Sequence, residues 1–200
     1  VAIQLLAVPI TAFLFLRTVG VDEGVAVGVA LVAAIPGGTT SNIFTFLARG
    51  NAALSITITA LTTLACLVST PLILSVLVSE YLPADFVMPT GMIIREIALT
   101  LLLPLAIGMA YLHLYPRSAA TLSRWAIRGS LLGILLIVIG SVSAGRLDIA
   151  AFGVDNVMRV LVFALALAVM GFAVPKLLGL STRDASAIEF EVIVRNVNLG

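Results

Sequence analysis

Apolar runs long enough to cross a lipid bilayer recur along this 200-residue chain and constrain its fold more than any other feature. A spanning helix needs about 20 mostly apolar residues. Residues 52–78 carry no charged side chain, and further apolar runs occupy 1–16, 24–47, 97–112, 129–144, 160–174 and 187–200. The alternating pattern of a membrane barrel is absent. We therefore predict an all-α integral membrane protein with about seven spans.

The composition excludes several other classes of protein. Hydrophobic residues make up 61% of the chain, charged residues only 10%, and the net charge is +1. Without a basic excess, no nucleic-acid partner is expected. A single cysteine, Cys66, excludes an internal disulfide and a multi-cysteine metal site. No Gly-Lys-Ser/Thr phosphate loop indicates ATP-driven transport, and nothing in the sequence indicates an oligomeric state.

The charges between the runs predict an orientation in the membrane. The second, fourth and sixth connections hold six Lys and Arg residues against one acidic residue, whereas the first, third and fifth hold four against seven. The positive-inside rule then places the connections that contain Arg49 and Arg124 in the cytoplasm. We expect a multi-pass protein of the cell (plasma or inner) membrane.

The second apolar run is interrupted at its centre by residues 36–42, with the sequence Pro-Gly-Gly-Thr-Thr-Ser-Asn. Proline removes a backbone donor, and paired glycines relax the backbone. Non-helical backbone at membrane depth persists only when it is buried in protein or lines a watery cavity. The segment therefore predicts a broken helix with oxygen ligands beside the break. The alternative is a kinked helix that packs between its neighbours.

The last run carries three charges, Glu189, Glu191 and Arg195. Each costs roughly 2.5–3.5 kcal/mol at a helix centre on insertion scales, so such residues are functional by default. Glu191 and Arg195 are four apart and would share a face of a continuous helix, where they could pair. A structural ion pair between two helices and a surface amphipathic helix are the alternatives.

The two interrupted segments also indicate an inverted repeat. They are the second and the seventh runs, so they cross the membrane in opposite directions. Interrupted spans in corresponding positions of two halves are typical of secondary transporters. The pattern therefore favours an inverted-repeat helical transporter with two discontinuous crossing helices.

The segment 36–42, together with residues 46–55, resembles the signature of the bile acid:sodium symporter superfamily. Residues 191–196 resemble that family's second motif in altered form. The resemblance implies a ten-helix fold, incomplete here at both ends, with a core domain and a panel domain. Residues 1–78 would hold the third to fifth family helices, at the end of the first repeat, with the break at 36–42. Residues 79–200 would hold the sixth to ninth helices, in the second repeat, with the break near 191–198.

The resemblance implies a first sodium site, whose ligands carry over as Ser41, Asn42, Ser55, Thr59 and Glu191. Hard cations prefer oxygen ligands, and one carboxylate balances one positive charge. Ser55 and Thr59 are four apart, which puts both hydroxyls on one face of a helix. We expect one sodium ion to bind here.

A second sodium site is implied only in part, through Gln4, Glu191 and the backbone at Val192 and Val194. Arg195 stands where the family usually has glutamine. A guanidinium only donates hydrogen bonds and stays charged, so it cannot ligate a cation. If the guanidinium lies at or beside this position, coupling falls to one sodium per cycle. The alternative is that Arg195 points to a cytoplasmic cavity and both sodium sites persist.

The resemblance places the substrate contacts at Thr39 and Asn196, and the charge of Arg195 would attract an anion toward them. Half-helix N-termini at such a crossing suit a carboxylate. The partners that we expect are therefore a small organic anion and the lipid bilayer.

The function that the sequence favours is sodium-coupled symport of a small organic anion, bile-acid-like or another carboxylate, by alternating access. A sodium-independent channel or facilitator is the first alternative. The second is an intramembrane enzyme that uses Glu189 and Glu191 as an acid pair. Residues two apart point about 200° away from each other on a helix, so we predict that the protein is not an enzyme.

Overall fold

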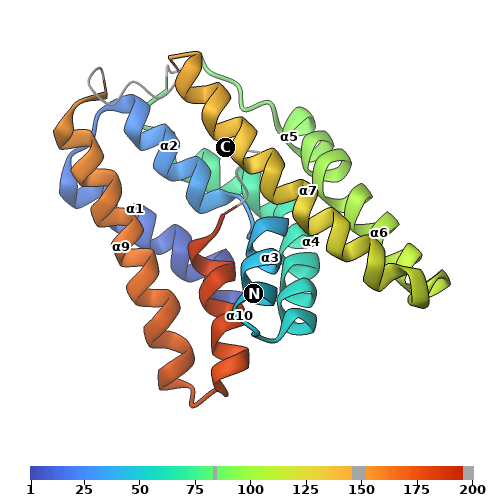
Figure 1. Cartoon of the computed structure of the whole chain (residues 1–200). Helices are drawn as coiled ribbons and strands as arrows, with labels where there is room; N and C mark the ends of the chain where they lie inside the picture. Colours follow the sequence, from blue (N-terminus) through green and yellow to red (C-terminus); the bar gives the residue numbers. More distant parts are fainter. Residues whose placement is uncertain (83–84, 146–151, 196–200) are drawn as a thin grey trace.

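The computed structural model describes residues 1–82, 85–145 and 152–195, and within these ranges the ordered elements are helices (Figure 1). In chain order they are η1 (Ile3–Ala7), α1 (Val8–Val19), α2 (Glu23–Ala34), α3 (Thr39–Leu47), α4 (Ala52–Leu77), α5 (Thr90–Ile97), η2 (Ala98–Leu102), α6 (Leu103–Leu114), α7 (Pro116–Ser143), α9 (Val154–Leu177) and α10 (Thr182–Ile193). By length and composition, α4, α5–α6, α7 and α9 can each cross a membrane. The predicted all-α membrane fold is confirmed.

The first interruption separates α2 from α3. Ile35 is extended, with φ −81° and ψ 151°, because the residue before a proline is driven out of the helical region. The non-helical segment is 35–38, shorter than the expected 36–42. The polar residues after Gly38 form the first turn of α3, where the backbone N–H of Ser41 bonds to the carbonyl of Gly38 at 3.0 Å. Side chains of this kind favour a helix N-terminus.

The second interruption begins at Val194, which is extended with φ −94° and ψ 95°. Glu191 therefore lies in the last helical turn of α10, whereas the break was expected near 191–198. Residues 196–198 of that expected break lie outside the described residues. Arg195 forms an isolated antiparallel bridge with Gly37. The two non-helical segments, residues 35–38 and 194–195, thus lie against each other. This region is called the crossing below.

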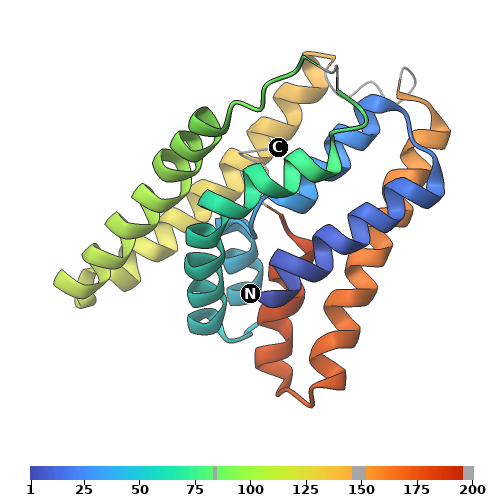
Figure 2. The same ribbon diagram turned by 180° about the vertical axis from the view of Figure 1, so that it is seen from behind.

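The hydrophobic core lies between α1, α2, α4, α9 and α10. Figure 2 shows α1 beside α9, and their contact includes Phe15 and Phe163, whose ring centroids are 5.3 Å apart. The buried face of α2 presents Ala26, Ala30 and Ala33. Small residues let membrane helices approach closely, so this face of α2 packs tightly in the cluster.

Two turns at one end of this cluster are tied together through Asn51. Its side chain caps α4 by accepting a bond from the N–H of Leu54 at 3.1 Å. Its own N–H bonds to the carbonyl of Arg183 at 2.9 Å, and its amide donates to Asp184 at 2.7 Å. The connection between α3 and α4 is thereby joined to the first turn of α10.

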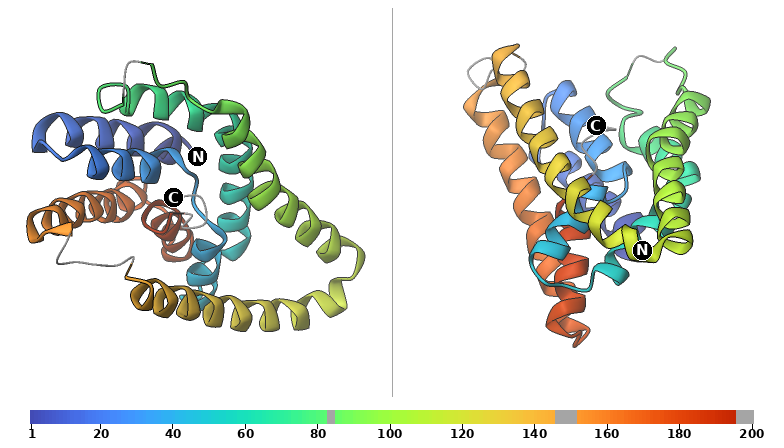
Figure 3. Two further views of the ribbon diagram at one scale, coloured as in Figure 1. Left: turned by 90° about the horizontal axis from the view of Figure 1, so that it is seen from above. Right: turned by 45° about the vertical axis from the view of Figure 1, so that its right-hand side comes forward.

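The segment from α5 to α7 forms an arm that runs out to the turn at Tyr115 and back (Figures 1 and 3). No described residue of α6 is buried, and Ala119 is the one buried residue of α7. The apolar side chains of α6 and α7 therefore point mostly outward, whereas Ile97 and Leu101 at the base of the arm pack against Cys66 of α4.

Candidate functional site

Glu191 is the centre of the site, and only 1% of it is exposed. Its Oε1 atom accepts bonds from the hydroxyls of Ser41 at 2.6 Å, Ser55 at 3.0 Å and Thr59 at 2.5 Å. Ser41 lies in the first turn of α3, and Ser55 and Thr59 lie on consecutive turns of α4. The break between α2 and α3 thus brings the start of α3 within reach of the end of α10.

Asn42 joins the same cluster through its side-chain oxygen. Its Oδ1 atom accepts from Ser55 at 2.6 Å and from Thr59 at 3.2 Å. Thr45, one turn further along α3, donates to the Ser55 hydroxyl at 3.3 Å. The five residues expected around the first cation, Ser41, Asn42, Ser55, Thr59 and Glu191, therefore converge in one place.

The oxygen cluster around Glu191 has fewer hydroxyl protons than it has close oxygen–oxygen contacts. The hydroxyls of Ser41, Ser55 and Thr59 make seven contacts of 2.5–3.2 Å with acceptor oxygens. Each hydroxyl carries one proton, so only three of these contacts can be ideal hydrogen bonds at any moment. Oxygen lone pairs that face one another without a proton between them are stabilised by a positive charge. This set of oxygen atoms therefore suits a bound cation.

Gln4 closes the site from the start of the chain. Its Nε2 atom donates to the carbonyl and to Oε2 of Glu191, both at 3.0 Å. Its Oε1 atom accepts from the N–H of Gly37 at 3.1 Å. A Cβ atom on Gly37 would lie 2.2 Å from Oε2 of Glu191 and 3.0 Å from its carbonyl oxygen, so a larger residue here would displace Glu191. Val192 is buried, and Val194 is the first extended residue after α10.

Arg195 is buried beside the cluster but does not pair with Glu191. The salt bridge found in the described part of the chain joins Arg17 to Glu80. The guanidinium of Arg195 donates instead to the carbonyls of Val32 and Ala33, at 3.0 and 3.2 Å, and of Ile35. The pairing that a continuous helix would allow does not form, because α10 ends at Ile193.

Two expected substrate contacts cannot be placed: Asn196 and the side chain of Thr39 lie outside the described residues. The sequence interpretation missed Thr45 and the steric role of Gly37. The spacing of Thr45 from Ser41 was a usable signal, because residues four apart share a helix face. Gly37 carried no such signal, since its close neighbour comes from the far end of the chain.

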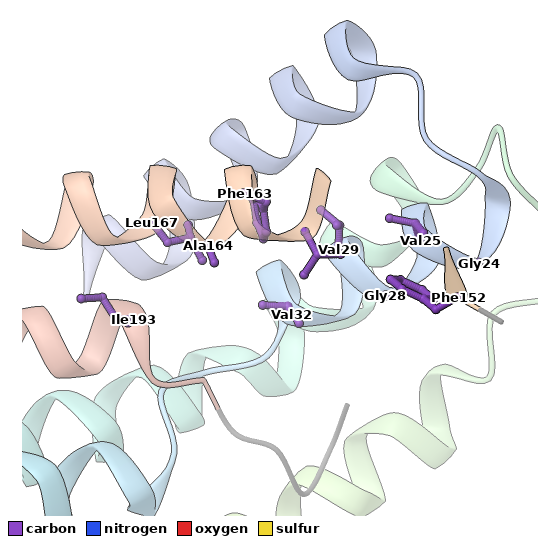
Figure 4. A pocket seen from close by; sticks show the side chains of 11 residues that line it. Gly24, Val25, Gly28, Val29, Val32, Phe152, Phe163, Ala164, Leu167 and Ile193 are labelled. Atoms are coloured by element: carbon purple, nitrogen blue, oxygen red, sulfur yellow. The ribbon is translucent and has the colours of Figure 1, made fainter. Parts of the chain in front are cut away.

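An apolar cavity of about 350 Å³ lies between α2 and α9 (Figure 4). Gly28 and Val32 line it from α2, Phe163 and Leu167 from α9, and Ile193 from the end of α10. None of the residues that line it is charged. The cavity can therefore accept an apolar group but offers no charged partner to an anion.

Among known protein families, the model of the sodium bile acid symporter family matches residues 1–152. This chain belongs to that family. A relative described as the uncharacterized sodium-dependent transporter YocS of Bacillus subtilis is 32% identical over 203 aligned positions. The alignment covers 98% of this chain and 60% of YocS.

Mammalian members of the sodium bile acid symporter family are also similar. The rat sodium-dependent organic anion transporter is 30% identical over 96% of this chain and 51% of its own length. The human ileal sodium/bile acid cotransporter is 27% identical over 96% of this chain and 55% of its own length. The chain thus spans about half of the length of the relatives that it matches. The family consists of transporters and not of enzymes, which removes the acid-pair alternative.

Proposed function

We propose that this chain forms part of a secondary active transporter that carries sodium together with a small organic anion. The proton-deficient oxygen cluster around Glu191 supports this proposal most strongly, because such a cluster binds a hard cation. The relatives named as sodium-dependent transporters point the same way. The crossing of two interrupted helices is also the usual location of coupled ion sites in such proteins.

In this proposal one sodium ion binds among Ser41, Asn42, Ser55, Thr59 and Glu191. One buried carboxylate balances the charge of one monovalent cation. Among the described residues, no group of three or more His, Cys, Asp or Glu side chains could hold a metal ion. The oxygen set of hydroxyl, amide and carboxylate groups thus suits sodium better than a transition metal.

The anion is proposed to bind beside the sodium, with Thr39, Asn196 and Arg195 at its charged end. The N-terminus of α3 faces the crossing and carries a partial positive charge. The Nη1 atom of Arg195 is buried and finds no acceptor among the described residues. A carboxylate of bile-acid type or similar supplies such an acceptor, and its apolar part suits the cavity between α2 and α9.

Alternating access is proposed to arise from movement between two parts of the protein. The core domain would comprise α1 to α4 with α9 and α10, which share the buried cluster and the site. The panel domain would comprise the arm from α5 to α7. In the cell membrane, the Arg49 turn would face the cytoplasm.

Uptake measurements test this function directly. We expect proteoliposomes that contain the protein at its full natural length to accumulate radiolabelled cholate under an inward sodium gradient. Replacement of sodium by choline should abolish accumulation. Uptake that is equal with and without sodium would instead support a passive facilitator.

The matched variants Glu191→Gln and Glu189→Gln separate the site from the rest of α10. Both remove one carboxylate from the same helix, but Glu189 makes no described hydrogen bond to the cluster. We expect Glu191→Gln to weaken sodium binding at least about tenfold, since bonds to charged groups contribute about 1.5–3 kcal/mol. Glu189→Gln should keep sodium binding within about twofold. Equal losses in both variants would contradict the assigned site.

A further inference from the structure

Two charged side chains are buried in the described part of the chain, Glu191 with 1% of its surface exposed and Arg195 with 7%. They lie on either side of the end of α10, and each has its own set of partners. Glu191 binds side chains of α3, α4 and η1, whereas Arg195 turns back toward α2. The carboxylate of Glu191 and the guanidinium of Arg195 therefore do not neutralise each other through an ion pair at the crossing.

The guanidinium of Arg195 satisfies the carbonyl end of α2. A helix leaves its last four carbonyls without partners, and here Pro36 has no N–H while the N–H of Gly37 is taken by Gln4. Arg195 donates to the carbonyls of Val32, Ala33 and Ile35. The hydroxyl of Thr70 donates to the remaining carbonyl, that of Ala34, at 2.7 Å. No free carbonyl remains at this end of the helix.

A half-helix C-terminus inside a membrane is a place where transporters hold a cation, because freed carbonyls and the negative end of the helix dipole both face it. In this chain a permanently charged guanidinium fills that place. We propose that Arg195 is a built-in cation that replaces a second transported sodium, so that one sodium ion accompanies each monovalent anion and transport is electroneutral. The proposal rests on the proposed symport function.

The charges at the crossing support electroneutral transport. With Glu191 and Arg195 both ionised, the empty crossing carries no net charge. One sodium ion and one carboxylate add charges that cancel, so the loaded crossing is neutral as well. Because Arg195 bonds to α2 and not to Glu191, the carboxylate remains free to balance the transported sodium.

The number of bound sodium ions can be counted without any substrate. A ligand that binds only the folded state stabilises it by RT ln(1 + [L]/Kd) per site. Well above Kd, the slope of the unfolding temperature against the logarithm of concentration, scaled by the measured unfolding enthalpy, therefore gives the number of bound ions. We expect the slope of unfolding temperature against the logarithm of sodium concentration, at constant ionic strength with choline, to correspond to one ion for the wild type. Arg195→Gln should double the slope by opening a second site, and Arg195→Lys, which keeps the charge, should not.

Membrane potential provides an independent readout. With a valinomycin-clamped potential, we expect sodium-driven cholate uptake by the wild type to change less than twofold between zero and inside-negative potential. Arg195→Gln should become faster at inside-negative potential.

A wild-type slope of two ions, or wild-type uptake driven several-fold by potential, would overturn the proposal and leave symport standing. A wild-type slope of zero would overturn the symport function itself. These wild-type results decide the question even if Arg195→Gln does not fold.

Discussion

Helices α4 and α7 have the same mean hydropathy over their most apolar 18 residues, yet 39% of that stretch is buried in α4 and none of it in α7. The difference follows from polar residues. The buried face of α4 carries hydroxyls such as Ser55, Thr59 and Thr70, and these bond to α2, α3 and α10. In lipid, apolar side chains give no hydrophobic drive for helices to associate, so polar bonds and small residues decide which helices pack.

The crossing region is therefore specified by a few close contacts, whereas α6 and α7 of the arm make almost no buried contacts. Substitutions in the crossing should have large and specific effects, and the same substitutions in the arm should have small ones. Two paired comparisons test this contrast, and two further sets of variants sharpen it, in order of decreasing expected effect.

The largest expected difference in the free energy of unfolding is between Gly37→Ala at the crossing and Gly133→Ala on α7. The new Cβ at position 37 would lie 2.2 Å from a carboxylate oxygen of Glu191 and 3.0 Å from its carbonyl oxygen, whereas position 133 on α7 has nothing within 4 Å. We expect Gly37→Ala to lower the free energy of unfolding by about 3 kcal/mol or more, with loss of the sodium-dependent rise in unfolding temperature. Gly133→Ala should be neutral or stabilising by up to about 1 kcal/mol. Similar unfolding temperatures for both would show that the crossing is less closely packed than described.

Phe163→Ala against Leu132→Ala compares apolar packing in the two regions. Phe163 is 3% exposed, whereas Leu132 on α7 is 57% exposed. Truncation of the buried ring should lower the free energy of unfolding in detergent by about 3 kcal/mol. Truncation of Leu132 should change it by less than about 0.5 kcal/mol. A large cost at Leu132 would mean that α7 packs against another surface.

Ser55→Ala and Thr59→Ala should each weaken sodium binding by about 1 kcal/mol, or roughly fivefold, because each removes one hydroxyl and no charge. Thr57→Ala is the matched control on α4, since its exposed hydroxyl bonds only to the carbonyl of Ala53. Calorimetric titration with sodium measures all three variants. If Thr57→Ala weakens binding as much as Ser55→Ala, the effect does not arise from the site.

Arg17→Gln should have the smallest effect. Arg17 and Glu80 form an ion pair with side chains 54% and 57% exposed, and exposed pairs contribute about 0–1 kcal/mol. We expect a change of less than about 1 kcal/mol in the free energy of unfolding, and a smaller one in high salt. A loss as large as that of Phe163→Ala would show that this exposed pair is coupled to the core.

Much of the site was predictable because its signals are local. Residues 36–42 indicated a break with oxygen ligands, and the buried charge at Glu191 indicated a functional position. The resemblance to a known family then joined these two segments to Ser55 and Thr59. The structure brings all of these residues together around one carboxylate oxygen.

The sequence located both breaks but not the residues at which each helix ends or resumes. Glu191 and Arg195 would face each other only on an unbroken α10, but the helix ends between them. The break in the second span was expected at residues 36–42, yet the backbone returns to helix at Thr39. Spacing rules apply within a regular element and give no information beyond its end.

The sequence by itself determined the membrane class, the number of apolar runs, the position of the first break at Pro36 and the identity of the buried charge. These depend on the solvent preference of each run and on the backbone limits of single residues, which act locally. The family resemblance had placed Gln4 and Glu191, 187 positions apart, at one site, but only the tertiary structure decided that they bond directly and that Arg195 binds the end of α2. The physical reason is that such contacts depend on how separate helices pack, and in a bilayer apolarity alone does not choose the partner of a helix.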